Sequence, residues 1–219
     1  MNTFWDQYYQ KPLSEIPWQN TQADWFKDLV DSGKISGTSA LDLGCGTGTK
    51  SIYLALAGDF KKVLGVDISK QAIKYAKNNA QDNKVEKICA FMCHDLNNWS
   101  FLPKDETFVF ILDWAVIHCF TRDEVISYAE NIASHCKTGG KVLVRSFASH
   151  DSAQKEFSEE VGGIKSKISL FNEDELRRYF PQFRIILQNT SQPSKTKTDA
   201  GYYFIELLMQ KEWTVRNIR

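Results

Sequence analysis

The sequence predicts an α/β fold in which helices cover both faces of a mostly parallel sheet. From about residue 38, short apolar runs of strand length alternate with segments of helical periodicity. Such alternation is typical of parallel strands that are joined by crossover helices. The last two strand-like runs have no helical segment between them, so they should form a hairpin, and one terminal strand should be antiparallel.

The first half of the chain supplies three expected strands. They are residues 39–43, 62–67 and 88–93, and the runs SALDL and KVLGVD are the clearest of them. A helix is expected at residues 49–57. A second helix follows Ser69, whose hydroxyl suits an N-cap, and extends for about three turns with its small apolar residues on one face.

The second half supplies four more strands, at residues 107–113, 141–147, 183–187 and 202–209. The last two are apolar runs on either side of a polar stretch, residues 188–199, which we expect to be a loop. This loop makes the closing hairpin of the sheet.

Two helices of the second half are marked by their first turns. Thr121 and Glu124 have the spacing of a capping box and open a helix that extends to about Cys136. The glycine pair in the following KTGGK should stop it. Asn172 and Glu175 open a shorter helix before the closing strands.

The composition excludes several classes of protein. Of 219 residues, 42% are hydrophobic and 25% are charged, which is ordinary for a folded domain and excludes a disordered chain. Lys plus Arg number 27 and Asp plus Glu number 27, so the formal charge is zero. A nucleic-acid binder usually needs a basic surplus, so nucleic acid is not the expected partner.

No targeting or membrane segment is expected. The opening MNTFWDQYYQ lacks the basic and apolar regions of a signal peptide, and the apolar runs are far shorter than the roughly 20 residues of a membrane helix. Five cysteines, an odd number, indicate reduced thiols and a cytoplasmic protein. Cys89 and Cys93 lie on a strand, no C-x-x-C pair exists, and we expect no metal site.

The strongest chemical signal is LDLGCGTG, residues 41–48, where a strand ends and a helix begins. Its three glycines allow a tight turn and a close approach of backbone to ligand, and the helix N-terminus directs N–H groups at that ligand. Asp67 ends the next strand, 23 residues after Gly44. Nucleotide-binding α/β folds place there the carboxylate that holds the ribose hydroxyls.

The type of nucleotide follows from the spacing. A dinucleotide site has the pattern G-x-G-x-x-G, but this chain has G-x-G-x-G, and no Gly-Lys-Ser/Thr of a P-loop follows. Asp42, which precedes the glycines, would repel a pyrophosphate. It suits a ligand with a positive ammonium or sulfonium group.

These motifs resemble class I S-adenosylmethionine-dependent methyltransferases. LDLGCGTG followed by GVDIS is similar to the first motif of the family and its successor, and His94-Asp95-Leu96 is similar to its adenine-contacting segment. Ile111-Leu112-Asp113 resembles the fourth motif. KTGG resembles the K-P-G-G turn, with threonine in place of proline. The likeness covers about residues 38–210 and implies a Rossmann-like, doubly wound sheet of seven strands.

A narrower likeness concerns small-molecule methyltransferases related to the thiopurine, thiol and tellurite-resistance enzymes. They have a similar W-x-x-x-Y and P-W opening, here at Trp5–Tyr9 and Pro17-Trp18. They also resemble this chain in the stretch Asp113 to His118 and in Arg145-Ser146-Phe147. The resemblance therefore implies a small methyl acceptor, such as a thiol or another soft nucleophile.

The family resemblance also implies roles for residues of the cofactor site. The glycine loop would pack on the methionine and ribose parts of S-adenosylmethionine, and Asp42 would face the ammonium group. Asp67 would hold the ribose, while Asp95 would hydrogen-bond the adenine amine. The expected cofactor contacts are Asp42, Gly44, Cys45, Gly46, Thr47, Gly48, Asp67, Ile68, Asp95, Leu96, Asp113, Trp114, Trp18 and Tyr9.

The expected acceptor side lies just beyond the ends of the fourth and fifth strands, with Tyr8, Trp114 and Phe147 as substrate contacts. His118 is a candidate base, a group that orients an anion, or a hydrogen-bonded structural histidine. Arg145 interrupts an apolar strand and needs a partner, either a core carboxylate, which we favour, or an anionic substrate.

The expected organisation is a helical cap, residues 1–37, over a cofactor-binding domain, residues 38–219. Residues 149–171 are a polar insert, either a substrate lid or a mobile loop. The leading functional hypothesis is methyl transfer from S-adenosylmethionine to a small molecule, with S-adenosylhomocysteine as product. An RNA or protein methyltransferase and a non-catalytic cofactor-binding regulator are the alternatives. The amino-methylating signature N-P-P-Y is absent after the fourth strand, which reads Asp113-Trp114-Ala115-Val116.

Overall fold

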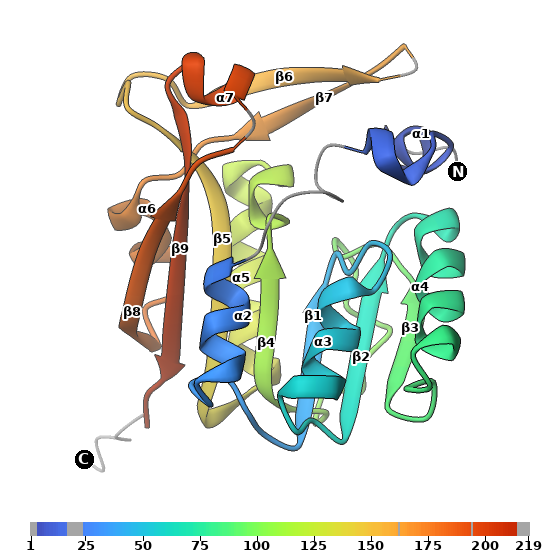
Figure 1. Cartoon of the computed structure of the whole chain (residues 1–219). Coiled ribbons are helices and arrows are strands. Elements are labelled where there is room, and N and C mark those ends of the chain that lie inside the picture. Colours follow the sequence, from blue (N-terminus) through green and yellow to red (C-terminus); the bar gives the residue numbers. More distant parts are fainter. Residues whose placement is uncertain (1–3, 17–23, 162, 194, 214–219) are drawn as a thin grey trace, which may run out of the picture.

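A computed structural model of the chain describes residues 4–16, 24–161, 163–193 and 195–213. Figure 1 shows one seven-stranded sheet with helices in front of and behind it, and a separate hairpin above it. The helices and strands, in chain order, are α1 (Phe4–Tyr9), η1 (Leu13–Glu15), α2 (Asp24–Asp31), β1 (Ser39–Leu43), α3 (Thr49–Ala57), β2 (Lys62–Asp67), α4 (Lys70–Asp82), β3 (Cys89–Cys93), β4 (Phe108–Trp114), η2 (Ile117–Cys119), α5 (Arg122–His135), β5 (Cys136–Ser149), β6 (Glu156–Val161), β7 (Ile164–Ser169), α6 (Glu173–Tyr179), β8 (Phe183–Ser191), α7 (Lys195–Asp199) and β9 (Tyr202–Lys211).

The sheet has the order β3-β2-β1-β4-β5-β9-β8. Strands β1 to β5 are mutually parallel, and β9 runs antiparallel to both β5 and β8. This confirms the expected doubly wound, mostly parallel sheet of the class I methyltransferase fold. The strand order reverses between β1 and β4, where Leu43 pairs with Asp113. In open α/β sheets ligands bind at such a reversal, outside the carboxyl ends of the strands.

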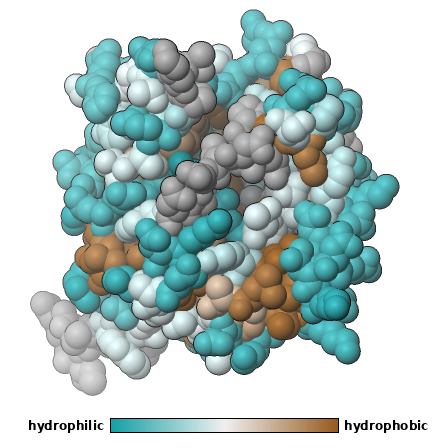
Figure 2. Space-filling model, in the orientation of Figure 1, coloured by the Kyte–Doolittle hydropathy of each residue, from teal (hydrophilic) through white to brown (hydrophobic). Residues whose placement is uncertain are grey.

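Two apolar clusters, one on each face, hold the helices against the sheet. On one face, α2, α3 and α4 pack on alternate strand residues such as Val63 and Leu112. On the other face, α5 and α6 pack on the neighbouring residues, such as Val66 and Ile111. Because side chains alternate across a strand, near-continuous apolar runs are needed to fill both layers. The face shown in Figure 2 is mainly hydrophilic, with apolar side chains in separate small areas.

The expected helix starts are confirmed. The Ser69 hydroxyl accepts the backbone N–H of Ala72 at 3.2 Å. The capping box at the start of α5, Thr121 with Glu124, is complete. So is the one at the start of α6, Asn172 with Glu175. These signals are local, because each cap satisfies backbone N–H groups that the first helical turn leaves free.

Three boundaries differ from the expectation. Strand β5 begins at Cys136, and Gly139 lies inside it with φ +78°, so the glycine pair does not end the helix. The pairing of β4 with β5 shifts register between Phe108 and Phe110, which accommodates the extra residues as a bulge. Residues 188–199 are not all loop, because β8 extends to Ser191 and a short helix, α7, follows.

Residues 149–171 form a hairpin rather than an irregular loop. Strands β6 and β7 pair antiparallel as a second, two-stranded sheet. In Figure 1 this hairpin and α1 both lie beyond the carboxyl ends of β1, β2 and β4, on the side to which the arrowheads point. Phe4 and Tyr8 of α1 pack against Val161 at the end of β6. The two added segments therefore meet each other above the sheet.

Candidate functional site

A cavity of about 580 Å³ lies at the carboxyl ends of β1, β2, β4 and β5. The sheet side of its wall contains the glycine loop and the residues that follow β2 and β4. The opposite side is formed by α1, by the β6–β7 hairpin and by α7. Its lining residues are Trp5, Tyr9, Phe26, Lys27, Asp42, Gly44, Cys45, Gly46, Thr47, Thr49, Lys50, Tyr53, Asp67, Ile68, Asp95, Leu96, Asn97, Trp114, Ala115, Val116, His118, Cys119, Phe120, Glu124, Arg145, Phe147, Glu159, Ile168, Pro193, Lys197 and Phe204.

The glycine loop turns sharply between β1 and α3. Gly44 and Gly46 have φ of +62° and +56°, a conformation that side chains with a Cβ rarely adopt. A Cβ on Gly46 would lie 2.6 Å from the hydroxyl of Tyr9, and one on Gly44 would collide with Val116. Val116 and Tyr9, which both line the cavity, thus pack directly on the backbone of the loop. Gly48 is not among the lining residues, because it turns the chain into α3 behind the cavity wall.

Asp67, at the end of β2, is 7% exposed and lines the cavity. One carboxylate oxygen accepts the backbone N–H of Gly46 at 2.8 Å, and the other accepts that of Ser69 at 2.8 Å. Burial raises the pKa of this carboxyl to about 6, although both hydrogen bonds lower it. Asp67 therefore ties the glycine loop to the start of α4 and presents a buried carboxylate to the cavity.

Asp42, one strand away on β1, is also buried and lines the cavity. Its carboxylate accepts the hydroxyl of Ser51 at 2.5 Å. Burial raises its pKa to about 6, and the nearby Lys50 opposes this shift. A buried carboxyl that is held this way is less costly when a cation lies beside it.

Beyond β2 and β3 the wall becomes apolar with one polar edge. Ile68 and Leu96 line the cavity, and Leu96 is 7% exposed. Asp95 also lines it, and one of its carboxylate oxygens accepts the backbone N–H of Asn97 at 2.9 Å. This part of the wall combines apolar side chains with a single carboxylate, a composition common in sites for small organic ligands.

Asp113 lies behind the wall rather than in it. It is fully buried, and one oxygen accepts the backbone N–H groups of Val116 and Ile117 at 2.9 and 3.2 Å. The other oxygen accepts the hydroxyl of Tyr128 at 2.9 Å. Both carboxylate oxygens therefore accept hydrogen bonds from within the protein, and Asp113 does not line the cavity. The prediction that Asp113 contacts the cofactor directly is replaced by a structural role. Asp113 fixes the loop that carries Trp114 and His118.

His118 lines the cavity and is 3% exposed. Its Nδ1 accepts the backbone N–H of Phe147 at 3.2 Å, which assigns the hydrogen to Nε2. Burial, together with the positive charge of Arg145, lowers the pKa of the imidazole to about 3. The ring is therefore neutral at physiological pH, and it has an N–H donor rather than a basic nitrogen for a ligand.

Arg145 has the carboxylate partner that we favoured. Its Nε lies 3.0 Å from an Oε of Glu206, and both side chains are at most 5% exposed. Its guanidinium carbon lies 3.7 Å from the ring centre of Phe204 and 4.6 Å from that of Trp114. The guanidinium also lines the cavity, so the ion pair holds a cation at the wall.

The remaining expected residues divide between the wall and its support. Tyr9, Trp114 and Phe147 line the cavity. Tyr8 does not, but its hydroxyl donates to Glu159 of the hairpin at 3.4 Å. Trp18 lies outside the described residues.

Several lining residues were not expected from the sequence. Lys50 could have been noticed in the sequence, because it lies in the first turn of a helix, where the helix dipole makes a positive charge unfavourable. A lysine at such a position suggests a role other than stabilising the helix. Glu159 and Lys197 form an ion pair of 2.6 Å between the hairpin and α7. Nothing local marks these two residues, because it is the tertiary fold that brings them to the cavity.

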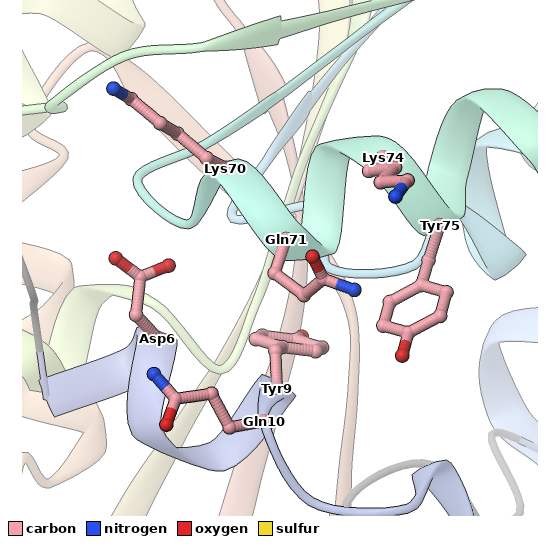
Figure 3. A pocket seen from close by; sticks show the side chains of 7 residues that line it. All are labelled: Asp6, Tyr9, Gln10, Lys70, Gln71, Lys74 and Tyr75. Atoms are coloured by element: carbon pink, nitrogen blue, oxygen red, sulfur yellow. The ribbon is translucent and has the colours of Figure 1, made fainter.

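A second hollow lies outside the cavity, between α1 and α4 (Figure 3). It is lined by Asp6, Tyr9, Gln10, Lys70, Gln71, Lys74 and Tyr75. Tyr9 also packs on Ala72 of α4, so this hollow marks where α1 rests on that helix. Tyr9 thus has one side toward α4 and one toward the cavity.

A metal site and a membrane-spanning helix were not expected, and the structure can be examined for both only in the residues that it describes. Within them no group of three or more His, Cys, Asp and Glu side chains could hold a metal ion. In the same part of the chain no helix is both long and apolar enough to cross a membrane.

Comparison with known proteins places these features in a family. Residues 40–140 match the family model described as "Methyltransferase domain". The probable S-adenosyl-L-methionine-dependent methyltransferase TehB of Haemophilus influenzae is 28% identical over 175 residues, which are 78% of this chain and 55% of the relative. The crystal structure of TehB aligns with a TM-score of 0.65 at 25% identity, covering 84% of this chain and 62% of that one.

Two other matches concern different acceptors. A ribosomal protein L11 methyltransferase of Aquifex aeolicus is 32% identical over 60% of this chain and 47% of its own length. The fold is shared with 1,6-didemethyltoxoflavin-N1-methyltransferase of Burkholderia thailandensis, a structure with S-adenosylhomocysteine bound. That structure has a TM-score of 0.71 and 17% identity, and it covers 90% of this chain and 81% of that one.

The chain spans about half the length of these curated relatives. The matched residues include the glycine loop, Asp67 and Asp95, which line the cavity. These matches and the seven-stranded sheet confirm the resemblance to class I S-adenosylmethionine-dependent methyltransferases.

Proposed function

We propose that this protein transfers a methyl group from S-adenosylmethionine to a small molecule. The observation that carries the proposal is the closed end of the cavity, where α1, the hairpin and α7 face the glycine loop. A cavity of about 580 Å³ is in the range of small-molecule sites. Elements that cover the cavity in this way leave room for a small acceptor beside the cofactor. Among the similar proteins, the didemethyltoxoflavin enzyme has a small-molecule acceptor bound in its structure, which supports this class.

The residues present fit the cofactor. Positive φ at Gly44 and Gly46 gives the loop the tight turn that would bring its backbone to the methionine and ribose parts, and a Cβ at either position would displace Val116 or Tyr9 of the wall. Asp67 would accept hydrogen bonds from ribose hydroxyls, and Asp42 would lie near the ammonium group. Ile68 and Leu96 would enclose the adenine, with Asp95 at its amine edge. The loop from Cys45 to Thr47, Trp114 and Tyr9 would complete this wall.

The bound cofactor supplies an electrophilic methyl group on a cationic sulfur. The chain's own part is to align an acceptor with that methyl group and to exclude water, and orientation alone can contribute about 7–11 kcal/mol. Trp114, Phe147 and Phe204 form the apolar walls of the acceptor end. His118 would donate Nε2–H to the acceptor or to an anionic group of it, rather than remove a proton.

Residues 1–37 and the insert 149–171 would act together as the cover of this site. The Tyr8–Glu159 hydrogen bond joins α1 to β6, and the Glu159–Lys197 ion pair joins β6 to α7. Glu159 also lines the cavity, so a ligand would contact the residue at which the three elements meet. Opening of this cover would admit the ligands.

The test begins with binding of S-adenosylhomocysteine by calorimetry to wild type and to Gly46→Ala. The variant places a Cβ 2.6 Å from the Tyr9 hydroxyl, so it should lose binding. Gly139→Ala is the matched control, because Gly139 also has a positive φ, +78° against +56° for Gly46, but nothing within 4 Å of a Cβ. Gly139→Ala should have the same kind of backbone strain, an alanine at positive φ, and should keep its affinity for S-adenosylhomocysteine.

Transfer is then measured with labelled S-adenosylmethionine against thiols, halides, chalcogen oxyanions, phenols and small amines. Labelling of at least one small molecule, lost in Gly46→Ala and kept in Gly139→Ala, is the expected result. Labelling of RNA or ribosomal protein alone would favour the macromolecular alternative. Tight cofactor binding with no transfer to any acceptor would favour a regulator.

A further inference from the structure

Two cations share one aromatic ring at the acceptor end of the cavity. The Lys50 Nζ lies 5.2 Å from the ring centre of Trp114, and the guanidinium carbon of Arg145 lies 4.6 Å from the same centre. Both side chains line the cavity. They reach it from different elements, Lys50 from the first turn of α3 and Arg145 from the end of β5.

The two cations differ in how their charge is balanced. Arg145 has Glu206 at 3.0 Å and a hydrogen bond of 3.3 Å to the hydroxyl of Ser191. Lys50 forms no ion pair with any carboxylate of the described residues. The opposite charge that acts on it is that of Asp42, whose carboxylate accepts the hydroxyl of Ser51. A half-buried ammonium group of this kind is costly until an anion meets it.

The charges around Lys50 add to the cost of its uncompensated positive charge. Arg145 and Lys27 face it with like charge, while Asp42 alone opposes them. Burial, Arg145 and Lys27 lower the pKa of Lys50 to about 8, despite Asp42. The helix dipole is also unfavourable, because Lys50 lies in the first turn of α3. Each of these effects would be reduced by a ligand with negative charge.

Charged side chains of both signs line the cavity, and Asp42, Glu124 and Glu159 are among the acidic ones. Asp67 and Asp95 lie on the side of β2 and β3, where the cationic cofactor would bind. Arg145 and His118 come from β5 and from the segment after β4, and the Nζ of Lys50, from α3, joins Arg145 over the ring of Trp114. Aromatic rings surround the guanidinium of Arg145: its carbon lies 3.7 Å from the ring centre of Phe204, which in turn lies 4.2 Å from the ring centre of Phe147.

We propose that Lys50 and Arg145, over the ring of Trp114, form an anion subsite that selects a negatively charged methyl acceptor. This inference rests on the proposed function, and it assigns Lys50 as the residue that determines acceptor charge. In the reaction a lone pair of the acceptor forms the new bond to the methyl carbon, and the carbon–sulfur pair stays on sulfur. An acceptor whose reacting atom is the anion loses its charge in this step, so no proton acceptor is needed.

The binding test uses protein loaded with S-adenosylhomocysteine and two pairs of probes matched in shape. They are benzoate with benzamide, and 3-mercaptopropionate with 3-mercaptopropionamide. Wild type should bind at least one anion about 10- to 100-fold more tightly than its neutral partner, the size of a hydrogen bond to a charged group. Lys50→Met should lose the preference, and Lys50→Arg should retain it.

Lys61→Met is the matched control. Lys61 is exposed and lies just before β2, at the opposite end of the sheet, so its loss changes the net charge equally without touching the subsite. A second readout is proton uptake, measured by calorimetry at pH 8 in buffers of different ionisation enthalpy. Anion binding should raise the pKa of Lys50 from about 8, so wild type should take up protons and Lys50→Met should not.

Two results would overturn the inference. One is equal affinity for anion and amide in both pairs. The other is a Lys50→Met variant that binds S-adenosylhomocysteine more weakly, keeps its affinity for 5′-methylthioadenosine and keeps the anion preference. The second result would assign Lys50 to the cofactor carboxylate. Failure of the proposed function can be distinguished from failure of this inference. It would appear as no methyl transfer to any acceptor, whereas the anion preference is measured by binding alone.

Discussion

Replacing Asp42 with asparagine should make the unliganded protein more stable at pH 8. The carboxyl is fully buried and its folded-state pKa is about 6, against an ordinary value of 3.8. A carboxyl whose pKa is raised on folding contributes stability at low pH and loses it as the pH rises through the folded pKa. Asparagine never ionises and its oxygen can still accept the Ser51 hydroxyl, so it avoids that loss.

The size of the effect follows from the two pKa values. Proton linkage between 3.8 and about 6 gives a gain of about 3 kcal/mol at pH 8 and about 1 kcal/mol at pH 4.5. Urea unfolding of wild type and Asp42→Asn at both pH values measures it. For a chain of this length about 3 kcal/mol corresponds to a rise in Tm of about 6–12 °C.

The control is Asp105→Asn, which removes the same charge from an exposed loop and should change stability by less than about 0.5 kcal/mol. Calorimetry should show that Asp42→Asn binds S-adenosylmethionine more weakly, because a charge facing the ammonium group is gone. A gain that is the same at both pH values, or a variant less stable than wild type at pH 8, would refute the burial argument.

Two further predictions concern neighbouring residues. Asp67→Ala leaves the backbone N–H groups of Gly46 and Ser69 without their acceptor, so it should lower the free energy of unfolding by about 2–4 kcal/mol. Calorimetry should also show loss of S-adenosylhomocysteine binding, and unchanged affinity would contradict the site. His118, with a pKa near 3, should give no inflection in kcat/KM between pH 5 and 8. His118→Asn, which can still accept the Phe147 N–H, should retain more activity than His118→Ala.

The elements that the sequence predicted correctly are those determined by local chemistry. Helix starts at Ser69, Thr121 and Asn172 were predictable because each cap bonds within its own first turn. The central strands were predictable because a sheet buried on both faces needs unbroken apolar runs. Asp67 could be placed for the same reason, since it follows such a run directly.

The hairpin within residues 149–171 was harder to predict, although the sequence contains a pattern that is typical of a hairpin. Two consecutive glycines separate a run rich in glutamate from a run rich in lysine. The strands pair so that Glu156 meets Lys167 at 2.6 Å and Glu160 meets Lys165 at 3.7 Å. Opposite charges across exposed strands add little stability, so the pattern is weak unless the pairing is known.

The correction at Asp113 shows why a motif position does not determine a contact. The chain after β4 has to leave the sheet, and Ala115 there has φ +73°, a conformation unusual outside glycine. Asp113 stabilises this turn by accepting two backbone N–H groups, and Tyr128 of α5 completes its hydrogen bonds. Whether a strand-end carboxylate faces the cavity or the following loop depends on which backbone N–H groups lie within its reach.

Three charged residues of the cavity share one property that links stability to the proposed function. Asp42 and Asp67 have raised pKa values and Lys50 has a lowered one, so each is shifted toward its neutral form. All three shifts have burial as their largest cause, which means that the protein alone does not compensate these charges. A cationic cofactor beside the carboxylates and an anionic acceptor beside the ammonium group would supply the missing counter-charges. Under the proposed function, the unliganded fold would give up stability at these three residues, and both ligands would restore it by supplying the opposite charge.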